Sequence, residues 1–237
     1  MAVTTEREPQ TPQRVPRTKA GRLWSSTVGK KAVMAVTGAV LFSYVVVHMA
    51  GNLKFFGGPD SINGYGVFLR EFLTPVLGYG GLVWVVRVVL LLAVVLHGTA
   101  AVQLARRARK ARPVGYAKRP RVQGGYAART MRWGGVILAL FVVYHLLDLT
   151  AGVLNPHGVD GDIHANVVAD FQHWYVVLAY TLAVVALGFH LRHGLWSAVR
   201  SLGGTVRNAQ TVALVLAVVV TVGFLAVPFS VFFGFVR

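Results

Sequence analysis

Four histidines lie inside strongly apolar stretches of the chain, where an ionisable side chain is costly. They are His48, His97, His145 and His190, and they stand 49, 48 and 45 residues apart. Imidazole is a common ligand of iron, and a haem iron takes axial ligands from the protein. Because chance would not place one histidine in each of four consecutive apolar stretches, the pattern predicts two haems, each bound by two histidines.

The composition indicates a membrane protein. The chain has 237 residues, of which 55% are hydrophobic and 14% charged, against about 25% charged in an ordinary soluble domain. It has no cysteine, which excludes disulfides, Fe–S clusters and thiolate-bound haem in this chain. The formal charge of +16 would suit nucleic acid, but the basic residues lie at the ends of apolar segments. Topology control explains that placement, so we expect no nucleic-acid partner.

The predicted fold is an all-α integral membrane protein with five transmembrane helices: a four-helix dihaem bundle plus a fifth packing helix. Residues 1–27 are predicted to be a basic cytoplasmic tail, and residues 28–237 the transmembrane cytochrome domain. A span needs about 20 residues of helix to cross a hydrocarbon core of roughly 30 Å. The predicted spans are 31–51, 79–104, 133–153, 170–195 and 209–235. In the connection 52–78, SINGYGVFLREFL predicts a short interfacial helix.

The basic residues predict the orientation. With a cytoplasmic N-terminus, 20 of the 24 Lys and Arg residues fall on the cytoplasmic side: in the tail together with Lys30 and Lys31, in Arg106–Arg132 and in Arg192–Arg207. The positive-inside rule therefore predicts a multi-pass protein of the plasma (inner) membrane, with its C-terminus outside. This orientation places His48 and His145 near the outer side of their spans.

Depth in the membrane predicts which histidines share a haem. His97 and His190 lie near the inner ends of spans two and four, so they form an inner pair, and His48 with His145 forms an outer pair. One histidine in a span is often a hydrogen-bonded core residue, but four matched in depth by pairs argue for ligands. His193 follows His190 by three residues and is an alternative inner ligand.

Other polar residues near the spans have two interpretations each. Asp148, one turn after His145, either forms a hydrogen bond within the bundle or marks the end of its span. Three further histidines fall in or beside the outer connection, and we expect them to be solvated: His157, His164 and His173.

Haem propionates need cations or hydrogen-bond donors. Arg87 lies ten residues before His97, about 15 Å further out along span two. It is a candidate for a propionate of the outer haem, or else an arginine that extends to the interface. Four residues at the inner end could bind propionates or contact a partner subunit: Lys30, Lys31, Arg192 and His193.

Three segments resemble a known family. GKKAVMAVTG at 29–38 and HMAGNLKFFGGPDSINGYGVFLR at 48–70 are similar to the first span and following connection of cytochrome b558-type membrane-anchor subunits of succinate dehydrogenase and fumarate reductase. FHLRHGLWSA at 189–198 resembles the fourth-span haem motif FHxxxGLW of that family, which favours His190 over His193 as ligand. The resemblance covers nearly all of the chain from about residue 25.

The resemblance implies a five-helix anchor in which His48, His97, His145 and His190 hold the irons of two b haems. It also implies a flavoprotein subunit that oxidises succinate and an Fe–S subunit that delivers electrons from the cytoplasmic side. The complex would be a succinate:menaquinone oxidoreductase whose succinate site lies on another chain. Some fumarate reductase relatives carry a glutamate two residues before the last ligand, where this chain has Gly188. That difference puts the associated transmembrane proton pathway in doubt.

A quinone site on the outer side would need a group that handles protons. Arg70 and Glu71 are the nearest candidates, and their alternative role is an interfacial salt-bridged pair. A quinone site at the inner face, between the Fe–S subunit and the inner haem, is a second location.

Two other functions fit parts of the pattern. One is the cytochrome b subunit of another quinone-linked dehydrogenase, such as a hydrogenase or a formate dehydrogenase. The other is a haem-free transporter or structural anchor that uses the histidines for protons or packing. A transporter would favour inverted repeats or broken helices, and the sequence shows no convincing repeat.

Overall fold

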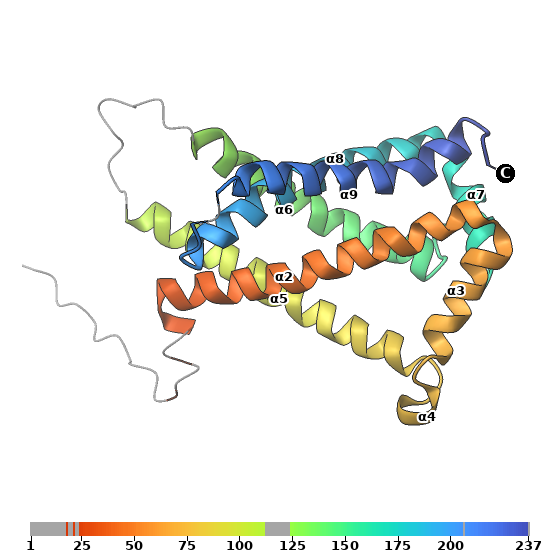
Figure 1. Ribbon diagram of the computed structural model, residues 1–237, viewed down its shortest axis with the longest axis horizontal. Helices are drawn as coiled ribbons and strands as arrows, with labels where there is room; N and C mark the ends of the chain where they lie inside the picture. Colours follow the sequence, from red (N-terminus) through yellow and green to blue (C-terminus); the bar gives the residue numbers. More distant parts are fainter. Residues whose placement is uncertain (1–17, 19–20, 22–23, 112–123, 206, 237) are drawn as a thin grey trace, which may run out of the picture.

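The computed structural model describes residues 18, 21, 24–111, 124–205 and 207–236 (Figure 1). Most of the predicted tail, and part of the loop between the second and third spans, lie outside these residues. The described part contains helices and no strand. Its long helices are α2 (Thr27–Asn52), α5 (Gly81–Lys110), α6 (Gly124–His145), α8 (Trp174–Ser201) and α9 (Ala209–Phe232). Its short elements are the 3-10 helix η1 (Leu53–Gly57), α3 (Pro59–Glu71), α4 (Thr74–Leu77), the π-helical turn η2 (Leu146–Thr150) and α7 (Ile163–Phe171).

Within the described residues, five helical segments are long and apolar enough to cross a membrane, which confirms the predicted all-α membrane fold with five transmembrane helices. They are Thr27–Gly57, Gly81–Lys110, Thr130–Thr150, Trp174–Ser201 and Ala209–Phe232. Large apolar side chains stay exposed along them, including Trp84, Leu91 and Leu140. Surfaces of this kind are stable against lipid rather than water, so the chain is a multi-pass membrane protein.

A separate short helix before the fourth span is one difference from the predicted boundaries. The fourth span begins at Trp174 rather than at residue 170, because α7 is a separate short helix. Asp162 caps the start of α7 by accepting a hydrogen bond from the Ala165 backbone N–H at 3.2 Å. The predicted short helix after the first span is also present: α3 follows Gly58, whose positive φ of 83° suits glycine.

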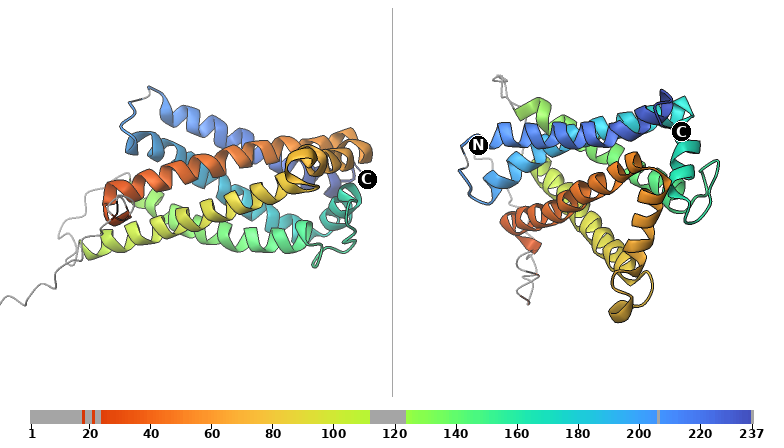
Figure 2. Two further views of the ribbon diagram at one scale, coloured as in Figure 1. Left: turned by 90° about the horizontal axis from the view of Figure 1, so that it is seen from below. Right: turned by 45° about the vertical axis from the view of Figure 1, so that its right-hand side comes forward.

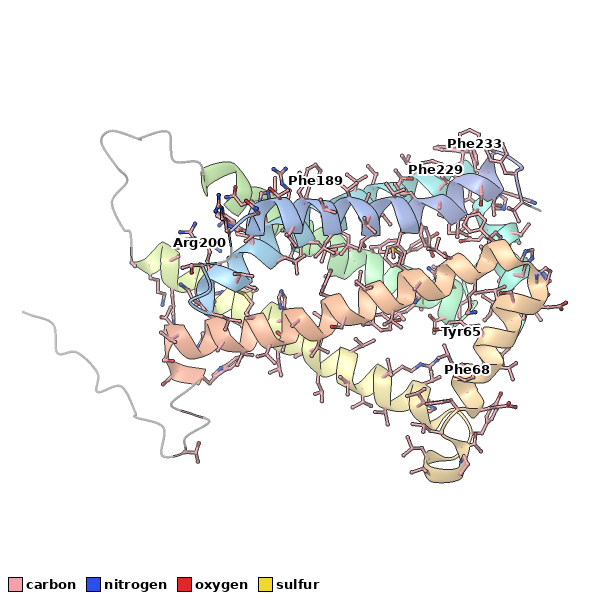
Figure 3. All side chains as sticks on the ribbon, viewed as in Figure 1. Tyr65, Phe68, Phe189, Arg200, Phe229 and Phe233 are labelled. Carbon is pink, nitrogen blue, oxygen red and sulfur yellow. The ribbon has the colours of Figure 1, made fainter. Side chains whose placement is uncertain are left out.

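The two ends of the bundle differ in charge. We call one the basic end: it holds the start of α2, the end of α5 and the end of α8 (Figure 1). Its exposed cations include Arg109 in the last turn of α5, and Arg200 in α8 (Figure 3). We call the other the acidic end, where α3, α4 and α7 lie. Every acidic residue of the described part belongs to the acidic end: Asp60, Glu71, Asp148, Asp160, Asp162 and Asp170.

The long helices pack in two groups. α8 packs closely on α9 and on α6, and α2 joins this group through α8 and α9. α5 packs along α2 near the basic end and diverges from it towards the acidic end, where α3 lies between them (Figures 1 and 2). In the described part, α5 makes few close backbone contacts, or none, with α6 and α8. Side chains must therefore bridge the space between α5 and α8.

Candidate haem-binding histidine pairs

The structure brings the four span histidines together as two pairs. At the acidic end, the rings of His48 on α2 and His145 on α6 have centroids 5.8 Å apart, with planes at 76°. Towards the basic end, the rings of His97 on α5 and His190 on α8 have centroids 6.3 Å apart, with planes at 58°. These are the pairs that the depth argument matches, and the ring opposite His97 belongs to His190 rather than to His193.

The ring separations suit an iron between each pair. Metal–nitrogen bonds of about 2 Å on opposite sides of an iron would hold two imidazole centroids about 6.3 Å apart. The observed separations of 5.8 and 6.3 Å lie close to that value. Two rings that only pack against each other have similar separations. The hydrogen bonds on the far side of each ring therefore distinguish a candidate metal site from simple ring packing.

The helices that carry each pair are not the helices that pack together. In the described part, α2 and α6 have few close backbone contacts, or none, and the same holds for α5 and α8. The paired rings therefore meet across a space that backbone packing leaves open. In addition, no group of three or more His, Cys, Asp or Glu side chains in the described part could hold a metal ion alone. Two imidazoles per site suit a metal whose other ligands come with its cofactor.

A hydrogen-bonded chain orients His145. Its Nδ1 lies 3.2 Å from the hydroxyl of Tyr180 on α8, and that hydroxyl donates to Asp148 Oδ2 at 2.9 Å. Because the Tyr180 proton goes to Asp148, the His145 Nδ1–H is the donor in the first bond. The His145 Nε2 then carries a free lone pair, which is the form of imidazole nitrogen that can bind a metal.

A backbone carbonyl orients His97 in the same way, through its Nδ1 atom. Its Nδ1 lies 3.1 Å from the Met34 carbonyl oxygen and 3.3 Å from Thr37 Oγ1. The Thr37 hydroxyl donates to the Val33 carbonyl at 2.7 Å, so the His97 Nδ1–H donates and its Nε2 lone pair is free. Gly38 makes room for the ring, since a Cβ there would lie 3.3 Å from His97 Cε1.

The two remaining histidines are held by packing. The ring of His48 stacks on Tyr44 with centroids 5.3 Å apart, and Phe224 lies 5.8 Å away on another side. The Nδ1 of His190 is buried and has no hydrogen-bond partner in the described part. An unsatisfied imidazole nitrogen in an apolar span is costly, which fits a ring kept for ligation rather than for structure.

The predicted propionate ligands lie in different settings. Arg87 is exposed; its guanidinium stacks over Trp84 at 5.0 Å and interacts electrostatically with the Tyr44 hydroxyl beside His48. Lys30 is already engaged, since its ammonium donates to the Trp24 carbonyl and lies 5.1 Å from that indole. The other three candidates are at the basic end, two exposed and one half-buried: Lys31, Arg192 and His193.

Arg70 and Glu71 do not form a salt bridge with each other in the described part. Arg70 instead pairs with Asp160 of the loop before α7, at 3.0 Å, and Glu71 is exposed. The alternative prediction of an interfacial salt bridge between Arg70 and Glu71 is therefore wrong, because Arg70 pairs with Asp160 instead. The Arg70–Asp160 contact ties α3 to the third connection at the acidic end.

One loop histidine departs from its predicted environment. His164 is buried and stacks on Phe55 with ring centroids 4.7 Å apart, so its prediction as a solvated residue is wrong. The cause is the packing of α7 against α3, which the sequence pattern does not specify. Its neighbour His157 remains partly exposed, 3.4 Å from Asp162.

Two residues of the site were not singled out by the sequence: Tyr180, which orients His145, and Asp170, which lies beside Asp148. The available signal was the scarcity of acidic residues, because Asp148 and Asp170 each adjoin an apolar span in a chain with 8 Asp and Glu in all.

Comparison of the chain with family models, curated proteins and solved structures gave no match. The histidine pairs and their surroundings are therefore the features that point to a function.

Proposed function

We propose that this chain is the membrane-anchor cytochrome b subunit of a succinate:menaquinone oxidoreductase. Each histidine pair would hold one haem b, and the two sites would relay electrons across the membrane. The observation that carries the proposal is the meeting of His48 with His145 and of His97 with His190 across helices that do not pack together. Succinate, the flavoprotein and Fe–S subunits, and menaquinone come from the family resemblance of the sequence.

The chain's residues would do three things for such cofactors. His145 and His97 would present Nε2 to the iron because Tyr180 and the Met34 carbonyl hold their Nδ1 atoms. Apolar side chains of the spans would exclude water from both sites. A haem held by the two histidines of a pair would supply one-electron transfer.

Haem content tests this proposal. Protein purified in detergent should bind about two haems per chain and give a reduced-minus-oxidised spectrum of b type. His145→Ala and His190→Ala should each lower the content to about one, because each removes one ligand from one pair. His173→Ala is the matched control, since His173 lies outside the spans at the N-cap of α8. A pure protein without haem would contradict the proposal.

The basic end is the proposed contact surface for the Fe–S subunit, on the cytoplasmic side. Its exposed cations, such as Arg109 and Lys110 at the end of α5, would attract an acidic partner. This attraction would weaken as the salt concentration rises. Reversing both charges to Glu should lower co-purification of a flavin- and Fe–S-containing partner. Lys54→Glu, at the acidic end, should leave co-purification unchanged. Co-purification of a nickel or molybdenum enzyme would instead indicate a hydrogenase or formate dehydrogenase partner.

A further inference from the structure

Two carboxylates are buried side by side at the acidic end. Asp148 on η2 is 0% exposed, and Asp170 in the last turn of α7 is 1% exposed. No Lys, Arg or His of the described part forms an ion pair with either of them. Burying two negative charges without a cation costs several kcal/mol for each ion, as an order of magnitude. The pair therefore needs another source of stabilisation.

The hydrogen bonds around the two carboxyl groups indicate that source. Asp148 Oδ2 accepts from the Tyr180 hydroxyl at 2.9 Å. Asp148 Oδ1 and Asp170 Oδ2 are buried and have no donor in the described part, although the two carboxyl groups lie within hydrogen-bonding reach of each other. Ionised carboxylates are acceptors only, so this contact becomes a hydrogen bond only when one group keeps its proton. Like charges at this range cannot both ionise cheaply.

The surroundings favour the protonated state. Burial, and then the neighbouring Asp148, raise the pKa of the Asp170 carboxyl well above its usual range. The titratable groups that face the pair are phenols: Tyr144 on α6 and Tyr180 on α8. Neither of these carries a positive charge that would favour two carboxylates.

We propose that Asp148 and Asp170 share one proton, and that this carboxyl pair acts on His145 through Tyr180. The pair would then hold the shared proton more tightly when an electron reaches the His48–His145 site. The second half of this inference rests on the proposed function. The geometry supplies the connection, since His145 Nδ1–H donates to Tyr180 and Tyr180 donates to Asp148.

The charge balance gives the sign of the effect. When the pair is deprotonated, Tyr180 becomes a stronger acceptor for the His145 N–H, and His145 becomes a more electron-rich ligand that favours ferric iron. Conversely, an electron added to the iron would favour protonation of the carboxyl pair. At pH values between the pKa of the pair beside ferric iron and its higher pKa beside ferrous iron, one electron would be matched by one proton from the water at the acidic end, so the midpoint potential should fall as pH rises through that range.

Infrared spectroscopy tests the shared proton, with or without cofactor. Near neutral pH, the protein should show a carboxylic-acid C=O band that shifts in D2O and is lost in both Asp148→Asn and Asp170→Asn. Asp170→Glu should restore a band because it keeps the carboxyl group. Asp162→Asn is the matched control from the same connection; the Ala165 N–H lowers the pKa of Asp162, so it contributes no such band. Absence of the band from the unsubstituted protein would overturn the shared proton.

Redox titration tests the coupling. His190→Ala should keep only the haem at His48 and His145, whose midpoint potential should fall by up to about 59 mV per pH unit around the pKa of the pair. Adding Asp170→Asn should flatten that dependence, and adding Asp162→Asn should not. A potential independent of pH would overturn the coupling while the infrared band stands. Protein that binds no haem would reject the proposed function and the coupling together, and the band would still decide whether the proton is shared.

Discussion

The two histidine pairs have similar ring separations but different supports. At the acidic end, His145 is held by a hydroxyl that leads to a buried carboxyl pair, and its partner His48 stacks on Tyr44 and contacts Phe224. Towards the basic end, His97 is held by a backbone carbonyl, and its partner His190 has no hydrogen bond at Nδ1 in the described part. One site is thus tied to ionisable groups, and the other to the backbone.

This difference gives the two sites different properties. A carboxylate-linked ligand responds to pH, because its support gains or loses charge. A carbonyl-linked ligand has no titrating group behind it. At the proposed haem sites, the acidic residues of one end would favour the ferric state and the cations of the other end would favour the ferrous state. Both effects would make the midpoint potential of the His48–His145 site the lower of the two. We therefore expect the His48–His145 site to have the lower potential and the stronger pH dependence, since the only titratable neighbour named at the His97–His190 site in the described part is the imidazole of His193.

The largest expected effect tests the pairing itself. His48→Ala with His145→Ala removes both ligands of one site and should leave about one haem per chain. His48→Ala with His190→Ala removes one ligand from each site and should leave none, although each double variant loses two histidines. Haem-to-protein ratios measure the difference. Equal haem content in the two double variants would show that the histidines do not act as these pairs.

A smaller effect should distinguish the supports. Tyr180→Phe removes the hydroxyl that orients His145 and should weaken haem binding at the acidic end by roughly 10- to 100-fold. The His97–His190 site should keep its affinity because Tyr180 does not support it. The affinities can be measured by haem titration of the His190→Ala and His145→Ala backgrounds, each of which keeps one site.

Tyr175→Phe is the matched control for Tyr180→Phe, since Tyr175 is an exposed residue of the same helix. It should change neither site. If Tyr180→Phe weakened both sites equally, the hydroxyl would serve the bundle in general rather than His145.

The fold was predictable from sequence because its main signals are local. Span length and apolar content determine which segments cross a membrane, and the five spans follow from them. The boundary at Trp174 was missed because α7 ends just before it, in a stretch as apolar as the span that follows. The burial of His164 was missed for a different reason, because it depends on how α7 packs against α3.

The depth-matched pairing of histidines was also accessible, because charge asymmetry converts sequence position into depth. The supports were not accessible. Whether Tyr180 faces His145 depends on the rotation of α8 about its axis relative to α6. The π-helical turn η2 adds a residue to the helical turn directly after His145 and so determines where Asp148 points. Hydropathy contains no information on either rotation.

The smallest expected effect concerns the basic-end site. In Gly38→Ala, the new Cβ would lie 3.3 Å from His97 Cε1 and 3.6 Å from Nδ1, so the ring must shift by a few tenths of an ångström. That shift should weaken haem binding there by a few-fold at most and leave the His48–His145 site unchanged. Haem titration of the His145→Ala background, which keeps only the basic-end site, measures it.

Thermal stability should move in the opposite direction from affinity. Alanine is favoured over glycine inside a helix by roughly 0.5–1 kcal/mol, so Gly38→Ala should not lower the unfolding temperature of the haem-free chain. Gly64→Ala in α3 is the matched control, because nothing lies within 4 Å of a Cβ there and haem affinity should stay unchanged. Weaker binding with unchanged or higher stability would show that Gly38 is kept small for the His97 ring. Lower stability with unchanged binding would show that it serves the packing of α2 on α5 instead.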